Sequence, residues 1–518
     1  VGRLENSGTL QAKQHAKLRA GGGIANAGLM TASRELVINT PADVDNGGGT
    51  LNARRIEVNA QSLRNRDGEI EQTGLSSLAL NAGTLSNRDG GRIGVADVAT
   101  GGGEGGGASS GGGSAGGESG GGSTGGESGG GVLPDVTPLA DGALNIAGVL
   151  SNDAGRINAG GGVALSMREG LDNSGGHIGL RSLSLTQGDL SNAGGTLDIT
   201  GAATLHTASI DNTGGALNVG GALDVHTGDF RNAGGTLSHS GATGTVQVDG
   251  TLDNTEGAIE SNAGALALGT GVLVNERGRL EHAGSDGLHL QLGTLRGANG
   301  VIVTNGAATV KVGDADHRGA VLGAGQLAVT AGTFDNRGGT VATTGTGTDT
   351  LTAETFDNGE GGLIESQGDL AIKAATFGNA GGSVQHASTG TLAIDATTLN
   401  GAGGTLASNG TLRITGTTTD LRNGTTQGQT IGIDTGALTT AGGNLTAFSG
   451  DALTVAARTW LDNTGGTIAT NGALLLTANA LNNAGGTLNS AGTDAAHVRV
   501  TGMFDNTAGL LAGRGGLT

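Results

Sequence analysis

Apolar residues alternate with polar or small residues in short runs along most of the chain. In the stretch LDNSGGHIGLRSLSLTQGDL, Ile178 and Leu180 lie two positions apart, and so do Leu183 and Leu185. This is strand spacing, because successive side chains of a β-strand point to opposite faces. Two or three short strands fit into each such stretch. Asn and Gly tolerate left-handed backbone conformations, so we expect the N-x-G-G element to form the sharp turns.

The same unit recurs as L-x-N-x-G-G-x-[LI] at intervals of 17 to 23 residues, apart from one longer gap. Its Asn is found at Asn6, Asn26, Asn46, Asn65, Asn87, Asn152, Asn173, Asn192, Asn212, Asn232, Asn254, Asn275, Asn336, Asn358, Asn379, Asn423, Asn463, Asn483 and Asn506. Degenerate copies carry Gly297, Asp316, Gly401 and Thr440 at this position, which makes 23 copies in all. A fixed period of this length indicates a repeat protein.

A single unit cannot bury its apolar side alone, but units stacked in parallel about 4.8 Å apart enclose a continuous interior. We therefore predict an all-β fold, a β-solenoid with about 20 residues per rung and roughly 23 rungs. The composition agrees with a thin interior. The 518 residues include 109 Gly, six Phe and one Trp, with no Tyr or Cys, so Leu, Ile, Val and Ala must fill the core.

Two columns of residues follow from stacking the copies in register. The Asn residues are expected to form a structural ladder at a corner, where their amides hydrogen-bond from rung to rung. Its members include Asn173, Asn192, Asn212, Asn232, Asn254, Asn336, Asn358, Asn379, Asn463, Asn483 and Asn506. Five Phe residues share the place two positions before this Asn or its equivalent, and we expect them in the interior. They are Phe230, Phe334, Phe356, Phe377 and Phe504.

One segment departs from the pattern. Residues 101–131 contain only Gly, Ser, Glu, Ala and Thr, which is typical of a flexible loop or linker. The chain therefore divides into repeats over residues 1–100, this insert over 101–131, and repeats over 132–518. The length of the gap favours a loop extruded from one corner of a continuous rod, and a hinge between two rods is the alternative.

Charge and hydropathy exclude several classes of partner. The formal charge is −19 and the sequence pI is about 4.8, without a basic patch to gather phosphates, so nucleic acid is not an expected partner. No apolar run is long enough to span a bilayer, and the first residues, VGRLENSGTL, lack the regions of a signal peptide. The absence of Cys excludes disulfides and zinc-thiolate sites.

An enzymatic function is the rival class, because β-helices also serve as polysaccharide lyases and hydrolases. Such enzymes need paired carboxylates or a carboxylate cluster that holds a cation. Asp172, Asp335, Asp357 and Asp462 each precede the Asn of a corner, which indicates turn-capping or solvated residues instead. No catalytic residue, cofactor site or metal site is predicted.

Two histidines are candidate metal ligands. His206 and His226 occupy the same position in adjacent copies, but no third ligand recurs beside them, and zinc sites usually recruit three or four.

The copies LDNSGGHI, LSNAGGTL, FRNAGGTL and LDNTGGTI resemble the filamentous haemagglutinin repeat region of two-partner secretion exoproteins of Gram-negative bacteria. The resemblance covers nearly the whole chain except the glycine-rich insert. It implies a right-handed parallel β-helix that forms at the cell surface. It also implies export of the unfolded chain through an outer-membrane transporter, the two-partner secretion partner.

The resemblance further implies a non-enzymatic, secreted or cell-surface stalk that holds an adhesive or toxin module away from the cell. Host or bacterial surface receptors or glycans are its expected partners. A delivery stalk specific to a contact-dependent growth inhibition toxin is the alternative, and a β-helix carbohydrate-active enzyme is a more distant one. The family's NPNG-type secretion motif is absent, since Pro41, Pro134 and Pro138 all lack a preceding Asn. The family's VENN-type toxin junction is absent too. We therefore expect this segment alone neither to direct its own secretion nor to poison a cell.

Overall fold

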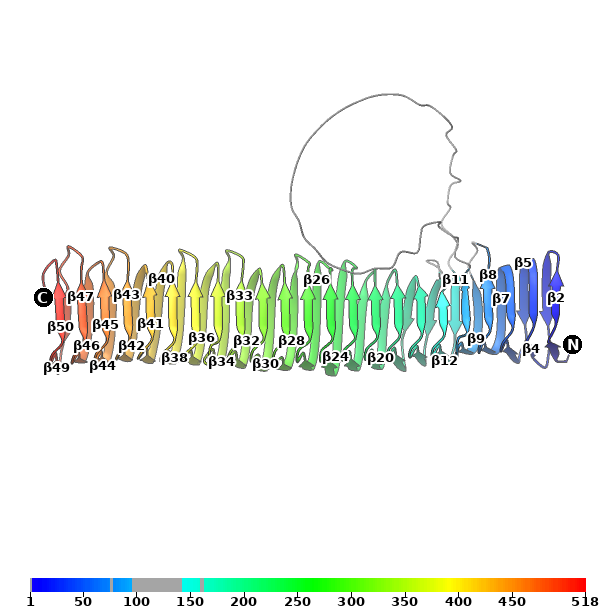
Figure 1. Ribbon diagram of the computed structural model, residues 1–518, viewed down its shortest axis with the longest axis horizontal. Coiled ribbons are helices and arrows are strands. Elements are labelled where there is room, and N and C mark those ends of the chain that lie inside the picture. The colour runs from blue at the N-terminus through cyan, green and yellow to red at the C-terminus, as the bar shows by residue number, and fades with distance from the viewer. Residues whose placement is uncertain (1, 75–77, 96–141, 159–162) are drawn as a thin grey trace, which may run out of the picture.

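The computed structural model describes residues 2–74, 78–95, 142–158 and 163–518. These residues form 50 β-strands and contain no helix, and every pair of neighbouring strands is parallel. Each strand pairs with the equivalent strand of the next repeat, as where Leu197 lies opposite Leu217. The fold is therefore a β-solenoid of about 22 turns, which confirms the predicted fold class. Figure 1 shows it as a straight rod with the two termini at opposite ends.

Each turn contributes to three faces that run the length of the rod. The first face follows the corner Asn and consists of the first part of β5 (Leu29–Asn39) and of β7 (Thr50–Arg64), with β2 (Thr9–Ala12), β8 (Glu69–Gln72), β10 (Arg92–Val95), β13 (Arg156–Asn158), β16 (His177–Leu180), β19 (Thr196–Ile199), β21 (Ala216–Val219), β23 (Thr236–His239), β25 (Ala258–Ser261), β27 (Arg279–His282), β29 (Val301–Thr304), β31 (Val321–Ala324), β33 (Thr340–Thr343), β35 (Leu363–Ser366), β37 (Ser383–His386), β39 (Thr405–Ser408), β41 (Thr425–Gly428), β43 (Asn444–Ala447), β45 (Thr467–Thr470), β47 (Thr487–Ser490) and β50 (Leu510–Gly513).

The second face comes next in the chain, and the third face leads into the following corner Asn. Short strands of the second face are β3 (His15–Arg19), β11 (Gly142–Ile146), β14 (Val163–Met167), β17 (Ser182–Leu185) and β48 (His497–Val500). Short strands of the third face are β1 (Leu4–Asn6), β4 (Ile24–Asn26), β6 (Asp43–Asp45), β12 (Val149–Ser151), β15 (Gly170–Asp172), β18 (Asp189–Ser191) and β49 (Phe504–Asp505).

Longer strands bend from the second face into the third. They are β9 (Ala79–Ser86), β20 (Ala203–Asp211), β22 (Leu223–Arg231), β24 (Thr243–Asp253), β26 (Ala265–Val274), β28 (Gly287–Arg296), β30 (Ala307–Asp316), β32 (Gln326–Asp335), β34 (Thr348–Asp357), β36 (Asp369–Gly378), β38 (Thr391–Asn400), β40 (Thr411–Asp420), β42 (Thr430–Thr439), β44 (Leu453–Asp462) and β46 (Leu474–Asn482).

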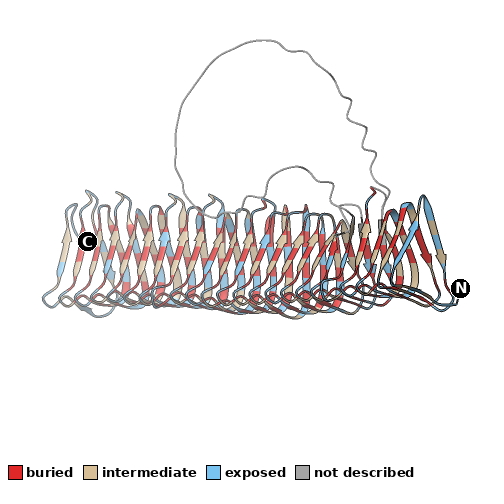
Figure 2. Ribbon diagram, turned by 45° about the vertical axis from the view of Figure 1, so that its right-hand side comes forward, coloured by how far each residue is buried: buried red, intermediate tan, exposed pale blue. Residues whose placement is uncertain are grey.

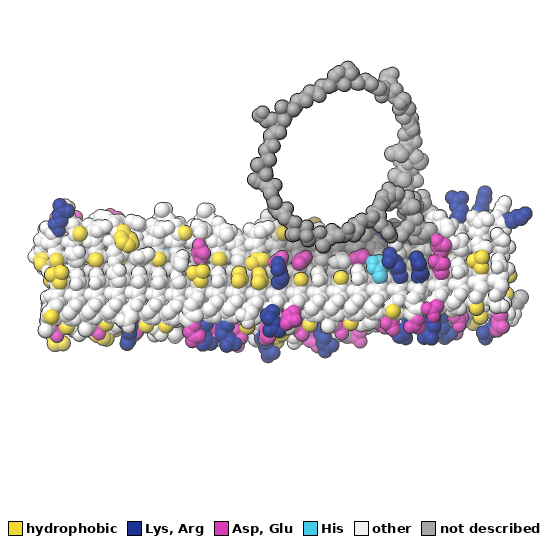
Figure 3. All heavy atoms as spheres, in the orientation of Figure 1, with side chains coloured by type: hydrophobic (Ala, Val, Ile, Leu, Met, Phe, Trp, Pro, Cys, Tyr) yellow, Lys and Arg dark blue, Asp and Glu magenta, His cyan; other side chains and the backbone are white. Residues whose placement is uncertain are grey.

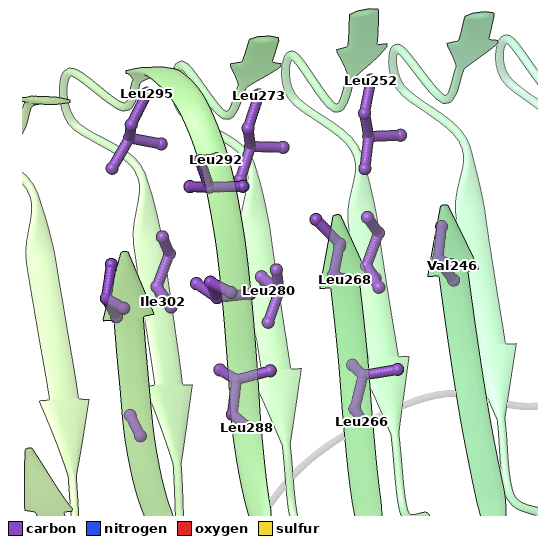
Figure 4. Packing of buried hydrophobic residues seen from close by; sticks show 14 of the residues in the cluster. Val246, Leu252, Leu266, Leu268, Leu273, Leu280, Leu288, Leu292, Leu295 and Ile302 are labelled. Carbon is purple, nitrogen blue, oxygen red and sulfur yellow. The ribbon is translucent and has the colours of Figure 1, made fainter. Parts of the chain in front are cut away.

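The core is a narrow interior lined by the inward residues of all three faces. In a first-face strand such as β19 the second and fourth residues are buried, whereas the first and third are partly exposed, and Figure 2 shows this alternation along the rod. Figure 4 shows that Leu252, Leu273 and Leu295 form one column of the interior, one residue per turn. Because each turn covers its neighbour, a core made mostly of Leu, Ile, Val and Ala side chains is sufficient to fill this interior.

The two glycines of the corner motif have different roles. Gly234 has a φ of 61°, in the left-handed region that favours glycine. Gly235 has no such φ, but an added Cβ would lie 2.1 Å from the backbone oxygen of Asn212 in the preceding turn. The first glycine therefore serves the bend of the chain, and the second allows adjacent turns to stack closely. Ala154, which replaces the first glycine in another turn, adopts a φ of 52°.

The coil is continuous across residues 96–141. The strand before them, β10, pairs with β13, and β9 pairs with both β11 and β12. β10 on the first face and β11 on the second face, the described strands on the two sides, therefore belong to the same turn of one solenoid. The flexible insert predicted for residues 101–131 lies outside the described residues.

Candidate functional site

Buried Asn side chains form a ladder at the corner between the third face and the first. In the longest run, the Nδ2 of each Asn donates to the Oδ1 of the Asn in the next turn, over 2.7 to 2.8 Å, from Asn6 to Asn275. The same Nδ2 also contacts backbone carbonyls: Asn232 donates to Gly235 O at 3.2 Å and to Ala258 O at 3.1 Å. The amides therefore satisfy one another and the corner backbone, which leaves them no free group for a ligand.

Every side chain of the ladder donates its hydrogen bond to the next turn, and this direction is the same after each interruption. After the interruption at Gly297, a second run begins with His317, whose Nδ1 donates to Asn336 Oδ1 at 2.7 Å. A third run begins with Thr440, whose hydroxyl donates to Asn463 Oδ1 at 2.8 Å. Each run after an interruption thus starts with a side chain that can donate, so the first Asn oxygen is not left unpaired. The further members are Asn358 and Asn379 in the second run, and Asn483 and Asn506 in the third.

Two ladder positions differ from the sequence assignment. The backbone N–H of His317, not that of Asp316, occupies the position of the ladder Asn, and Leu421 takes this position instead of Asn423. Asn423 has a φ of 55° and replaces the first glycine of the motif. The assignment of Asp316 and Asn423 was wrong because their polar side chains imitate the motif Asn, whereas backbone geometry sets the register.

Aspartates that precede the ladder position cap the corner. Asp172 Oδ1 accepts from the backbone N–H and the hydroxyl of Ser174, and Asp462 accepts in the same way from Thr464. Asp335 accepts from the backbone N–H of Arg337, and Asp357 from that of Gly359. These carboxylates are therefore held by the turn that follows them, which is a structural role.

Guanidinium groups also bond to aspartates at this position of the corner, as at Asp316 and Asp335. Arg318 donates to both oxygens of Asp316, at 2.8 and 2.7 Å, and Arg337 donates to both oxygens of Asp335, at 2.9 and 2.7 Å. These hydrogen bonds hold the pKa of the Asp316 and Asp335 carboxyls below their usual value. Both acids therefore stay ionised at neutral pH, which does not suit a general acid.

Four of the five Phe residues of the predicted column are fully buried. Phe334 and Phe356 stack with ring centroids 4.9 Å apart, and Phe377 meets Phe356 edge-on at 5.9 Å. Phe230 is also fully buried, between turns that carry Ile and Leu. Phe504 lies opposite the buried Leu481 of the preceding turn and is 42% exposed. Its strand β49 lies in the last turn of the described chain, and no later strand covers it.

His206 and His226 lie side by side, and each faces a carboxylate. They pair across β20 and β22, with ring centroids 6.2 Å apart at an interplanar angle of 72°. Each Nε2 faces a carboxylate, Asp224 at 3.1 Å for His206 and Asp249 at 3.4 Å for His226. Within the described ranges, no three His, Cys, Asp or Glu side chains gather closely enough to hold a metal ion.

A shallow hollow of about 250 Å³ lies on the second face, over the strands β24 to β30. The longer side chains of Gln247, His289 and Lys311 line this hollow together with the small residues Ala267 and Gly269. No carboxylate lines this hollow, so it lacks the acid–base pair of a glycosidase.

Sequence reasoning missed a group of buried histidines. His239, His282 and His386 each end a first-face strand and point inward. The Nε2 of His282 donates to Ala263 O at 2.9 Å, and its Nδ1 accepts from the Thr304 hydroxyl at 2.9 Å, so the neutral ring satisfies both nitrogens. Burial lowers the pKa of His239, His282, His386 and also His317. Their place four residues after the second glycine could have identified the three strand-end histidines as inward.

Comparison with known proteins identifies the repeat. A family model described as the haemagglutinin repeat matches residues 181–256, 240–294, 290–389, 387–447 and 448–502, which together cover more than half of the chain. No curated protein and no solved structure matches the chain. In the part of the chain that the structure describes, no helix has the length and apolarity needed to cross a membrane.

Proposed function

The chain belongs to the haemagglutinin repeat family, and on this premise we propose that it is a non-enzymatic stalk within a large exoprotein at a bacterial cell surface. The stalk holds an adhesive or toxin module away from the cell. In this proposal, the exoprotein leaves the cell unfolded through a two-partner secretion transporter, and the turns stack as they emerge.

The observation that carries the proposal is the continuity of the three faces over about 22 turns. At about 4.8 Å per turn the rod is roughly 105 Å long. Parallel strand pairing connects each turn to the next along the same axis, and the corner ladder adds side-chain hydrogen bonds within each of its runs. Such an arrangement suits a stiff spacer whose useful property is its length.

The outer surface supports the non-enzymatic part of the proposal. The carboxylates with the clearest positional pattern cap corners, and the hollow over β24 to β30 has no carboxylate in its lining. Incubation with pectin-like and other acidic polysaccharides tests this point. Release of reducing or unsaturated ends at a measurable turnover would refute a purely structural role.

Two variants of the exoprotein that carries this chain distinguish the effect of stalk length from the effect of surface chemistry. Deletion of residues 212–357 joins Asp211 directly to Asn358, which removes whole turns and keeps the corner motif intact. We expect this variant to lose binding or delivery to target cells, because the module no longer reaches them. The matched control keeps the length and replaces the exposed charged residues of 212–357 with Ser, and it should retain activity. The opposite result would assign the binding to the repeats themselves, as for glycans bound at several turns.

A further inference from the structure

The number of charged residues on the outer side of the first face falls from the N-terminal half of the rod to the C-terminal half. From β8 to β27 its outward positions carry many charges, namely Glu69, Glu71, Arg92, Arg156, Asp198, Glu260, Arg279 and Glu281. From β29 to β50, Glu365 is the only charged residue at the outward positions of this face, all of which the structure describes. Figure 3 shows this face, with its charges at the N-terminal end and along the lower corner.

We name the outward side of β29, β31, β33, β35, β37, β39, β41, β43, β45, β47 and β50 the uncharged face. Val301, Val303 and Val321 supply its apolar end, and Val321 is 37% exposed. The central strands carry short side chains such as Thr405 and Ala407. A protein with a net charge of −19 has charged residues to place, so their exclusion from one continuous face needs an explanation.

We infer that the uncharged face is the interface of a homodimer, in which two copies of this chain pack face to face. The outward side chains repeat once per turn, at about 4.8 Å. A surface with this repeat is matched over its full length only by a surface with the same repeat, and a second copy provides one. Short side chains from two such sheets interdigitate without water, as between paired β-sheets elsewhere.

The area is sufficient for a stable dimer. Eleven strands about 4.8 Å apart, each four residues wide at about 3.3 Å per residue, cover roughly 650 Å² per copy. The two copies together therefore bury about 1,300 Å², within the range of specific protein–protein interfaces.

The distribution of charge selects an antiparallel arrangement with the two-fold axis at β39. In a parallel dimer with its axis along the rod, Glu365 would face its own copy. In the antiparallel dimer β35 lies over β43, so Glu365 faces Asn444 and Thr446. The apolar ends also meet, since β29 lies over β50 with Leu510. The charged halves of the two rods then extend in opposite directions and do not face each other.

Substitution at the two-fold axis tests the dimer in the full chain. Thr405→Lys places two ammonium groups against each other at β39, and we expect dimerisation to weaken at least about a hundredfold. The matched control is Thr236→Lys, at the same position of β23 in the charged half, which should dimerise like the wild type. A mixture of Thr405→Lys and Thr405→Glu should restore a heterodimer by charge pairing.

Sedimentation equilibrium measures the association, and solution scattering measures the length of the dimer. An overlap of about half the turns gives a particle roughly 160 Å long, against roughly 105 Å for a single rod or for a dimer aligned along its whole length. A wild-type chain that stays monomeric at about 100 µM would overturn the inference. So would equal weakening by the Thr405→Lys and Thr236→Lys substitutions, or a dimer no longer than the single rod.

Discussion

The polarity of the Asn ladder predicts that two similar substitutions have unequal costs. Asn232 lies in the middle of a run, and its Nδ2 donates to Asn254 Oδ1 at 2.8 Å. Asn379 ends a run, because the next turn carries Gly401. Replacing either Asn with Leu gives a side chain that this position accepts, since Leu421 occupies it with 3% exposure.

The difference lies in which atoms lose their partners. In Asn232→Leu, the buried Oδ1 of Asn254 loses its donor and no other donor is in place. In Asn379→Leu, the preceding Asn358 loses one acceptor but still donates to Gly362 O at 3.2 Å and Ser383 O at 3.0 Å. An unsatisfied buried polar atom costs about 1 to 3 kcal/mol. We therefore expect Asn232→Leu to destabilise its turns by about 2 kcal/mol more than Asn379→Leu does.

Native-state hydrogen exchange measures this difference locally, which suits a solenoid whose turns open in part. Amides of the corner around residues 232–258 should exchange about 30 times faster in Asn232→Leu, beyond the change seen around residues 379–405 in Asn379→Leu. Local opening free energies that change equally, within about 0.5 kcal/mol, would show that the ladder has no functional polarity.

Three further predictions test the corner, the core and the response to pH. Gly235→Ala should destabilise the rod by more than about 2 kcal/mol because its Cβ collides with the preceding turn, whereas Gly234→Ala should cost about 1 kcal/mol; equal shifts in thermal unfolding would contradict the two glycine roles. Phe356→Asp should lower the melting temperature strongly by burying a charge, whereas the exposed Arg231→Ser should not, and similar melting temperatures would place Phe356 outside the core. The buried histidines have lowered pKa values, so their neutral form is favoured in the folded state; stability should be full above about pH 6.5 and fall below it, by at most about 1.4 kcal/mol per pH unit for each histidine. Thermal unfolding from pH 7.5 to 5 checks this, with His282→Gln expected to reduce the slope, and a pH-independent melting temperature would refute it.

The sequence was sufficient to predict the solenoid, because period and alternation are both local signals. The spacing of the Asn residues gave the length of a turn, and the successive positions of Phe334, Phe356 and Phe377 gave the interior column. Both follow from the rule that equivalent residues of neighbouring turns lie opposite each other.

The prediction errors arose where a residue of a different type takes the place of the motif Asn because its geometry fits that place. His317 continues the ladder because its ring N–H reaches the same oxygen that an amide would reach, and the motif letter gave no sign of this. The uncharged face could not be recognised from the sequence alone. It becomes visible only when the strand register shows which residues of each first-face strand point outward and which point into the core.

The side-chain amides of the corner all point the same way, from each turn toward the one that follows it in the chain. The leading edge of a partly folded rod therefore presents N–H groups, and the next turn arrives with the matching oxygen. Folding from the N-terminal side adds each layer to a prepared template, whereas folding from the other side would begin on bare oxygens. The orientation of the corner amides thus favours the addition of turns from the N-terminal side toward the C-terminal side.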